Sequence, residues 1–216
     1  MTEEIKDGQK EVSEIVTLVS GSRESINSAI ELKKQYPQSR VDLLHVTGVN
    51  WNHADSFPVD IMYMLNRIAP GVGDCYTCDA GIVRKYINDD PYFKARRYLC
   101  ERCQLSLAIV LSQFIAEKGY AKLLYCGPDQ CEKLWRSVAS VIIGPHQILK
   151  WDYPILDYGI ESYMIHKDCS PIFYPALYME DPFESSEVKR LCYELVDKGI
   201  LTSLYYEKIE YEDMPF

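Results

Sequence analysis

Short apolar runs alternate with stretches of helical periodicity along most of the chain. Residues 14–20 (Glu-Ile-Val-Thr-Leu-Val-Ser) and residues 40–47 (Arg-Val-Asp-Leu-Leu-His-Val-Thr) are rich in aliphatic side chains, and a glycine follows each run. Such runs are typical of strands that are buried on both faces. Apolar positions at helical spacing between them predict a helix from Glu24 to about Tyr36. The spacing predicts two parallel strands joined by a crossover helix.

The same alternation continues toward the C-terminus. Helical periodicity from Leu105 to Ile115 ends at Gly119, and an apolar run at 121–126 predicts the third strand. Alternating elements of this length predict an α/β fold with a doubly wound parallel sheet in a single domain, 1–216. Residues 71–103 are instead rich in cysteine, aromatic and basic residues, which predicts a Cys-rich insert. The remaining predictions are helices at 56–69, 129–140, 150–158 and 187–198 and strands at 141–143 and 161–166.

Composition narrows the classes of function. The chain has 216 residues, 47% of them hydrophobic, and a formal net charge of −9. No apolar run approaches the roughly 20 residues of a bilayer span, and the polar N-terminus is unlike a signal peptide. We therefore expect a soluble, cytoplasmic protein without membrane contact. The negative charge disfavours a broad nucleic-acid surface, although residues 84–102 interleave basic and aromatic side chains that could stack a nucleobase or RNA or simply be solvated.

The loop after the first strand, Ser20-Gly-Ser-Arg-Glu-Ser25, is a candidate phosphate site. Small side chains let backbone amides approach phosphate oxygens at the N-terminus of the following helix, where the helix dipole favours an anion. Arg23 could pair with a phosphate and Glu24 could hold Mg²⁺, while Ser22 and Ser25 add hydroxyl donors. Taken alone, the same loop is also an ordinary helix cap.

The eight cysteines include two Cys-x-x-Cys pairs, Cys75/Cys78 and Cys100/Cys103, with 21 residues between them. Disulfides are disfavoured without a secretory signal. Four thiolates in two pairs, each spanning a tight turn, suit a closed tetrahedral Zn²⁺ site.

Several segments, taken in order, carry a family resemblance. Val19–Ser25 resembles a Ser-Gly-Gly-x-Asp-Ser loop, and His45–Gly48 resembles a strand end that holds adenine. Cys100–Cys103 followed by Lys122–Asp129 resembles a Cys-x-x-Cys, helix, strand, Gly-His-x-x-Asp order. Later segments (142–150, 157–160 and 168–170) resemble an Arg-Pro-Leu, Lys, Gly-Ile and Asp-x-Ser run. These are the motifs of the N-type ATP pyrophosphatases, the PP-loop or adenine nucleotide alpha hydrolase-like superfamily. The chain departs from them at Ser22, Glu24 and Pro128.

The resemblance implies a Rossmann-like fold of the HUP type and an adenylation reaction that releases pyrophosphate. It implies ATP binding by Ser20, Gly21, Ser22, Arg23, Ser25, Thr47 and Gly48, and catalytic roles for Glu24, Asp129 and Lys150. Asp129 could equally cap the next helix, and Lys150 could be a solvated lysine. The departures leave open a nucleotide-binding protein that has kept the fold without catalysis.

The resemblance leaves the substrate and the metal open. One alternative is a small-molecule nucleobase, as in 7-cyano-7-deazaguanine synthase of queuosine biosynthesis. A second is tRNA thiolation, which some relatives perform with a [4Fe-4S] cluster at the positions of Cys100, Cys103 and Cys169. A phosphoadenylyl-sulfate reductase-like enzyme is a more distant alternative. A homodimer is also left open.

Overall fold

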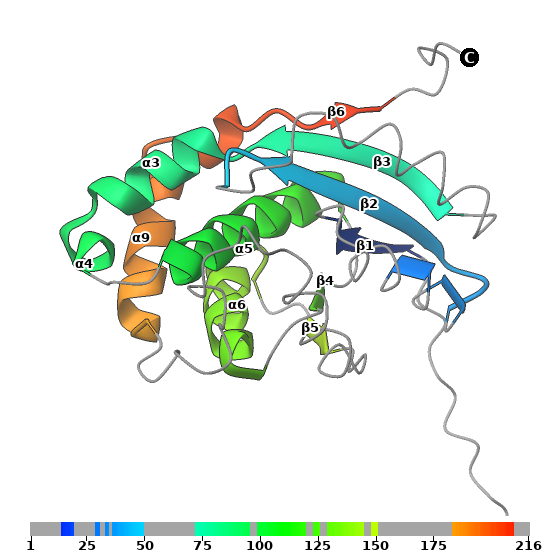
Figure 1. Cartoon of the computed structure of the whole chain (residues 1–216), viewed down its shortest axis with the longest axis horizontal. Helices are drawn as coiled ribbons and strands as arrows, with labels where there is room; N and C mark the ends of the chain where they lie inside the picture. The colour runs from blue at the N-terminus through cyan, green and yellow to red at the C-terminus, as the bar shows by residue number, and fades with distance from the viewer. Residues whose placement is uncertain are drawn as a thin grey trace, which may run out of the picture.

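The structure is a computed structural model that describes residues 14–19, 29–30, 33–34, 36–49, 72–95, 99–119, 123–125, 129–144, 148–150 and 183–209. A curved sheet in the order β1-β2-β3-β6 lies across the molecule (Figure 1). Strands β1 (Glu14–Leu18), β2 (Arg40–Thr47) and β3 (Val72–Asp79) are parallel. The short edge strand β6 (Glu207–Lys208) is antiparallel to β3.

Two further strands, β4 (Leu123–Tyr125) and β5 (Ile148–Lys150), form a parallel pair. Strand β4 contacts β1, the end strand of the four-stranded sheet. The chain therefore builds outward from β1 to β3 and later returns to β1 with β4. Parallel strands that alternate with helices in this way are typical of a doubly wound α/β fold, and the predicted fold class is confirmed.

Strand β2 shows why the sheet forms where it does. Its residues from Val41 to Val46 are all buried. Consecutive burial means that both faces of the strand are covered, which is the environment of a central parallel strand. The predicted bounds 40–47 agree with the strand, because aliphatic side chains occupy both of its faces and the two buried polar residues, Asp42 and His45, have hydrogen-bond partners.

Helices pack on the sheet and on one another. They are α3 (Gly81–Asp89), α4 (Pro91–Lys94), α5 (Leu99–Lys118), α6 (Asp129–Ile142) and α9 (Ser185–Asp197), followed by a 3-10 turn, η2 (Leu201–Ser203). Helix α5 contacts α3, α6 and β2, and every residue from Leu105 to Ser112 is buried. A helix covered on all sides belongs in the core. No helix in the described part of the chain is long and apolar enough to cross a membrane.

The largest difference from the sequence prediction concerns residues 72–79. They were expected to lie in an insert, but they form β3 of the main sheet, and residues 81–89 form the helix that follows it. The strand breaks its apolar pattern with Gly73 and Asp74, and the carboxylate of Asp74 is paired with Arg40 and Lys208. Polar residues inside a strand break the apolar pattern from which a strand is predicted, and their partners are distant in the sequence. The pattern alone therefore does not predict β3.

Two smaller expectations also change. The strand expected at 141–143 is wrong, because α6 continues to Ile142. Residues 148–150 form strand β5. Lys150 therefore ends a strand, whereas the sequence predicts that it begins a helix. The segment predicted as a helix from Glu24 is helical at 29–30 and 33–34. The helix predicted at 56–69, the rest of the helix predicted at 150–158 and the strand predicted at 161–166 lie outside the described residues.

The C-terminal segment, which we define as Leu201–Lys208, closes one side of the core. The Tyr206 hydroxyl donates a hydrogen bond to the buried Val110 carbonyl over 2.8 Å. Its ring lies 4.9 Å from the ring of Phe114, which lies at the same distance from Tyr76 of β3. These contacts fasten the C-terminal segment to α5 and to the sheet.

Candidate functional site

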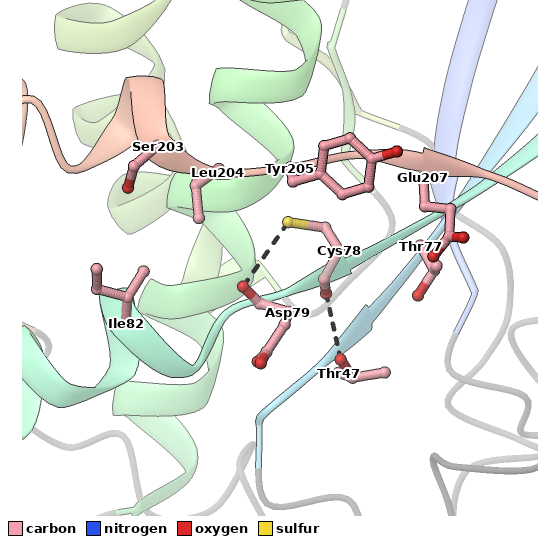
Figure 2. A pocket seen from close by; sticks show the side chains of 9 residues that line it. All are labelled: Thr47, Thr77, Cys78, Asp79, Ile82, Ser203, Leu204, Tyr205 and Glu207. Carbon is pink, nitrogen blue, oxygen red and sulfur yellow. Dashed lines mark hydrogen bonds between the residues drawn. The ribbon is translucent and has the colours of Figure 1, made fainter.

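The carboxyl ends of β2 and β3 meet in one place. Thr47 is the register partner of Asp79, and the Ala80 amide donates to the Thr47 carbonyl over 2.9 Å. The Thr47 hydroxyl donates to the Cys78 carbonyl over 3.5 Å (Figure 2). In parallel α/β sheets, ligands bind outside the carboxyl ends of the strands. Thr47, one of the residues expected to bind ATP, is therefore at an edge where a ligand can bind.

Gly48 follows directly and approaches the start of α3 closely. Its backbone has a φ of +74°, in the left-handed region that favours glycine. A Cβ at this position would overlap the Asp79 carboxylate and lie 2.7 Å from the Gly81 nitrogen. The Gly81 amide in turn donates to Asp79 Oδ1 over 2.8 Å. Glycine at position 48 thus allows the turn after β2 to reach the first turn of α3.

A cavity of about 370 Å³ opens at these strand ends. Its walls come from β2, β3, the first turn of α3 and the C-terminal segment, as Figure 2 shows. The volume is in the range of small-molecule sites in proteins. The lining residues are Thr47, Thr77, Cys78, Asp79, Ile82, Ser203, Leu204, Tyr205 and Glu207.

The cavity is acidic. Asp79 and Glu207 line it, and none of its described lining residues is a lysine, arginine or histidine. Burial, together with the charges of Asp79 and Glu117, raises the pKa of the Cys78 thiol to about 12. Carboxylates repel phosphate oxygens and accept hydrogen bonds from N–H groups. The cavity is therefore suited to a neutral or cationic ligand, or to the base end of a nucleotide.

Two hydrogen bonds to β2 hold Val19, the residue that follows β1. The Val19 amide donates to the Leu44 carbonyl over 3.0 Å, and Nδ1 of buried His45 lies 2.8 Å from the Val19 carbonyl. A carbonyl only accepts, so Nδ1 carries the proton in this contact. Val19 is the last described residue before the Ser20–Ser25 loop. The two bonds fix the point at which that loop begins.

Cys75 and Cys78 do not lie as a zinc site requires. The expectation that they span a tight turn is wrong, because both belong to β3. Side chains three positions apart on a strand point to opposite faces, and only Cys78 joins the core on the α5 side. Among the described residues, no three His, Cys, Asp or Glu side chains gather as a metal ligand set. The closed four-cysteine zinc site does not fit this arrangement.

Cys100 and Cys103 belong to the first turn and a half of α5. Burial raises the pKa of the Cys103 thiol, and the guanidinium groups of Arg84 and Arg102 oppose the rise. The Cys100 side chain and Cys169 lie outside the described residues, so the [4Fe-4S] cluster stays a prediction from the sequence.

The buried thiols predict a loss of stability in alkali. Burial raises the pKa of Cys75, Cys78 and Cys192 from 9.0 to about 12. The unfolded chain releases these protons at lower pH than the folded chain. The stabilisation is therefore complete below pH 9 and is lost as the pH rises toward 12. We expect the urea midpoint to fall across this window.

The control is Cys192→Ala, which removes one of the three thiols. Its midpoint should start lower at pH 8, because a buried group has been deleted, and should then fall less steeply than that of the unchanged protein. Equal slopes would contradict the assignment. In addition, these thiols should react slowly with a disulfide reagent at pH 8 until urea unfolds the chain.

The remaining predicted site residues lie at the ends of strands or in the segments that follow them. Thr47 ends β2, Asp129 begins α6 after β4, and Lys150 ends β5. The loop residues Ser20, Gly21, Ser22, Arg23, Glu24 and Ser25 follow β1 and lie outside the described residues. Sequence reasoning missed Asp79, Tyr205 and Glu207. An aspartate two residues before a helix start signals Asp79, whereas nothing local signals the two C-terminal residues.

Comparison with known proteins finds a likeness among solved structures. No model of a protein family matches the sequence, and no curated protein matches it. Among solved structures, the chain is similar to the U34-tRNA thiolase NcsA from Methanococcus maripaludis with its [4Fe-4S] cluster. The likeness has 18% sequence identity and a TM-score of 0.46, and it covers 92% of this chain and 72% of the thiolase chain. A match at this level does not assign an activity to the chain.

Proposed function

We propose that this chain is an ATP-dependent adenylating enzyme that releases pyrophosphate and modifies a nucleobase, either free or within tRNA. The observation that carries the proposal is the position of β1, which pairs with β2 and is contacted by β4 when the chain returns. The Ser20–Ser25 loop follows this strand directly. In doubly wound sheets, ligands bind where the strand order reverses.

The positions of the other predicted site residues support the same site. Thr47 and Gly48 follow β2, Asp129 follows β4, and Lys150 ends β5. Strands joined by crossover helices run in the same direction, which supports a common side for these positions. With β1 between the contacts to β2 and β4, we expect the phosphate loop between the adenine side and the catalytic residues.

The charge distribution supports one orientation of ATP. The cavity beside Thr47 is lined by carboxylates and would repel a triphosphate. The base therefore belongs on the β2–β3 side, and the phosphates belong at the loop that follows β1, near Arg23. Lys150, on the far side of β1, is suited to stabilising the leaving pyrophosphate as a fixed positive charge.

The chemistry follows from this placement. A carbonyl oxygen of the acceptor base attacks the α-phosphorus, the bond to the bridging oxygen breaks, and pyrophosphate leaves with its electrons. A nucleophile then displaces AMP from the adenylated carbon. The protein positions the two reactants and stabilises the charge that develops on the phosphates. Mg²⁺, which Glu24 is expected to hold, would neutralise part of that charge when bound.

Pyrophosphate release tests the proposal. With ATP and either unmodified tRNA or a nucleobase acceptor, we expect release that Arg23→Ala and Lys150→Ala each lower by about 10²-fold or more, the usual cost of losing one charge-stabilising donor. Lys189→Ala, on the exposed face of α9, should leave the rate unchanged.

Two results would contradict the proposal. One is the absence of any ATP binding. The other is ATP binding without pyrophosphate release with any tRNA or nucleobase acceptor, which would identify a nucleotide-binding protein without catalysis. Iron analysis of anaerobically purified protein tests the predicted cluster separately, because the adenylation step does not depend on it.

A further inference from the structure

The C-terminal segment places an exposed aromatic ring at the mouth of the cavity. Leu204 and Tyr206 are buried, whereas Tyr205 between them is 76% exposed. The neighbours fix the backbone on both sides, since the Tyr206 hydroxyl donates to the buried Val110 carbonyl. Tyr205 is therefore held outward by a fixed backbone, and a ligand can reach the face of its ring. The negative face of such a ring attracts cations.

Two carboxylates lie on one face of the sheet edge that borders the cavity. Thr77 of β3 and Glu207 of β6 are register partners, and both line the cavity. Side chains alternate along a strand, so Asp79, two residues beyond Thr77, lies on the same face as Glu207. Diagonal neighbours of this kind on paired strands are about 7–8 Å apart. Figure 2 shows the two carboxylates on either side of Cys78.

No cation in the described part of the chain neutralises this pair of carboxylates. Asp79 Oδ1 accepts from the Gly81 amide, and a carboxylate has further lone pairs for other donors. Neither Asp79 nor Glu207 forms a salt bridge with a described residue, and the neighbouring Lys208 is paired with Asp74 over 3.2 Å. Like charges on neighbouring strands repel each other, so a cation from solution that binds here relieves the repulsion.

The rest of the cavity lining is suited to an aliphatic chain. Ile82, in the first turn of α3, is 41% exposed, and Leu204 contributes a second apolar wall. The Cys78 thiol stays neutral, because burial raises its pKa to about 12. Methylene groups are stabilised when such walls remove them from water. The cavity of about 370 Å³ thus combines apolar walls with two separated carboxylates and an exposed ring.

We propose that this cavity binds an aliphatic diamine, with one ammonium group at Asp79, the other at Glu207 and the ring of Tyr205 in cation–π contact. A single ammonium group, such as that of a lysine side chain, would leave one carboxylate without a counter-ion, which favours a free diamine over a protein partner. The strand order β2-β3-β6 separates Thr47 from Glu207 by two strand spacings of about 4.8 Å. The diamine therefore leaves the Thr47 end open, and the inference goes beyond the proposed function because it needs neither ATP nor an acceptor base.

Calorimetry without ATP tests the proposal. It would compare the diamine putrescine, the monoamine butylamine and Mg²⁺ at low ionic strength, where exposed charges are least screened. Putrescine should bind more tightly than butylamine. Glu207→Gln should weaken putrescine binding about 1.5- to 5-fold, the range for one exposed ion pair, and should narrow the difference between the two amines.

Tyr205 and a distant carboxylate supply the controls. Tyr205→Ala should weaken the binding of both amines about 2- to 5-fold, the range for an exposed cation–π contact. Tyr205→Phe keeps the ring and should bind them like the unchanged protein. Glu184→Gln removes an exposed carboxylate before α9, outside the cavity lining, and should leave putrescine binding unchanged. This variant controls for the general attraction of cations to a chain with a net charge of −9.

Three results would overturn the proposal. Putrescine binding that responds equally to Glu207→Gln and Glu184→Gln would show general charge attraction in place of a site. Equal affinities for putrescine and butylamine would give the cavity to a single ammonium group, such as a lysine side chain of a protein partner. Mg²⁺ that binds more tightly than either amine and is indifferent to Tyr205→Ala would assign the carboxylates to a divalent cation. None of these results bears on pyrophosphate release, so failure of this proposal is distinguishable from failure of the proposed function.

Discussion

Phe114→Ala is expected to lower the free energy of unfolding by about 3–5 kcal/mol, the usual cost of deleting a buried phenyl ring. Phe114 is completely buried on α5, and its ring lies 4.9 Å from each of the rings of Tyr76 and Tyr206. It therefore joins the central helix to β3 and to the C-terminal segment. Loss of the ring should leave a cavity, because α5 is packed against other elements and cannot shift to fill it.

Urea denaturation measures this effect, and two variants divide it. Phe114→Leu should cost less, because it retains part of the apolar volume. Tyr206→Phe removes only the hydroxyl and should cost about 0.5–1.5 kcal/mol, the usual net contribution of one hydrogen bond. A loss below about 1 kcal/mol for Phe114→Ala would contradict the packing described for α5.

Gly48→Ala is expected to destabilise the protein and to weaken ATP binding together. Alanine in the left-handed conformation costs about 1–2 kcal/mol, and the overlap of its Cβ with Asp79 and the Gly81 backbone adds about 1–3 kcal/mol of overpacking. Relief of the overlap moves the carboxylate of Asp79, so the cavity changes shape. Chemical denaturation and calorimetry with ATP measure the two effects.

Gly119 provides a matched control within the same chain. Its φ is +77°, almost that of Gly48, but a Cβ there would meet nothing within 4 Å. Gly119→Ala should therefore cost only the backbone strain, and ATP binding should not change. If both glycine variants behaved alike, the close approach between the β2 turn and α3 would play no part in the site.

The phosphate and base sides of the proposed ATP site rest on different kinds of observation. The phosphate side comes from the position of the Ser20–Ser25 loop after β1, with Val19 held by Leu44 and His45. The base side comes from a described cavity with named walls. The two are joined by β2, which pairs with β1 and with β3. Variants on the two sides should therefore separate triphosphate affinity from base preference.

The sequence by itself determined the elements whose chemistry is local. The aliphatic run 40–47 is buried on both faces as β2, helical spacing from Leu105 marked the core of α5, and the alternation of strands and helices specified a doubly wound sheet. Each of these elements is predicted by the spacing of apolar residues that are close together in the sequence. The turn at Gly48 was also visible, because it follows a buried strand.

Only the tertiary structure decided what depends on distant partners. Cys75 and Cys78 have metal-like spacing, but pairing with β2 extends them into a strand and sends their side chains to opposite faces. Residues 205 and 207 gained a place at the cavity because the C-terminal segment packs on Phe114 and pairs with β3. Spacing along the chain cannot show which strand a segment will join, since that choice is made by burial and hydrogen bonding between segments far apart in sequence.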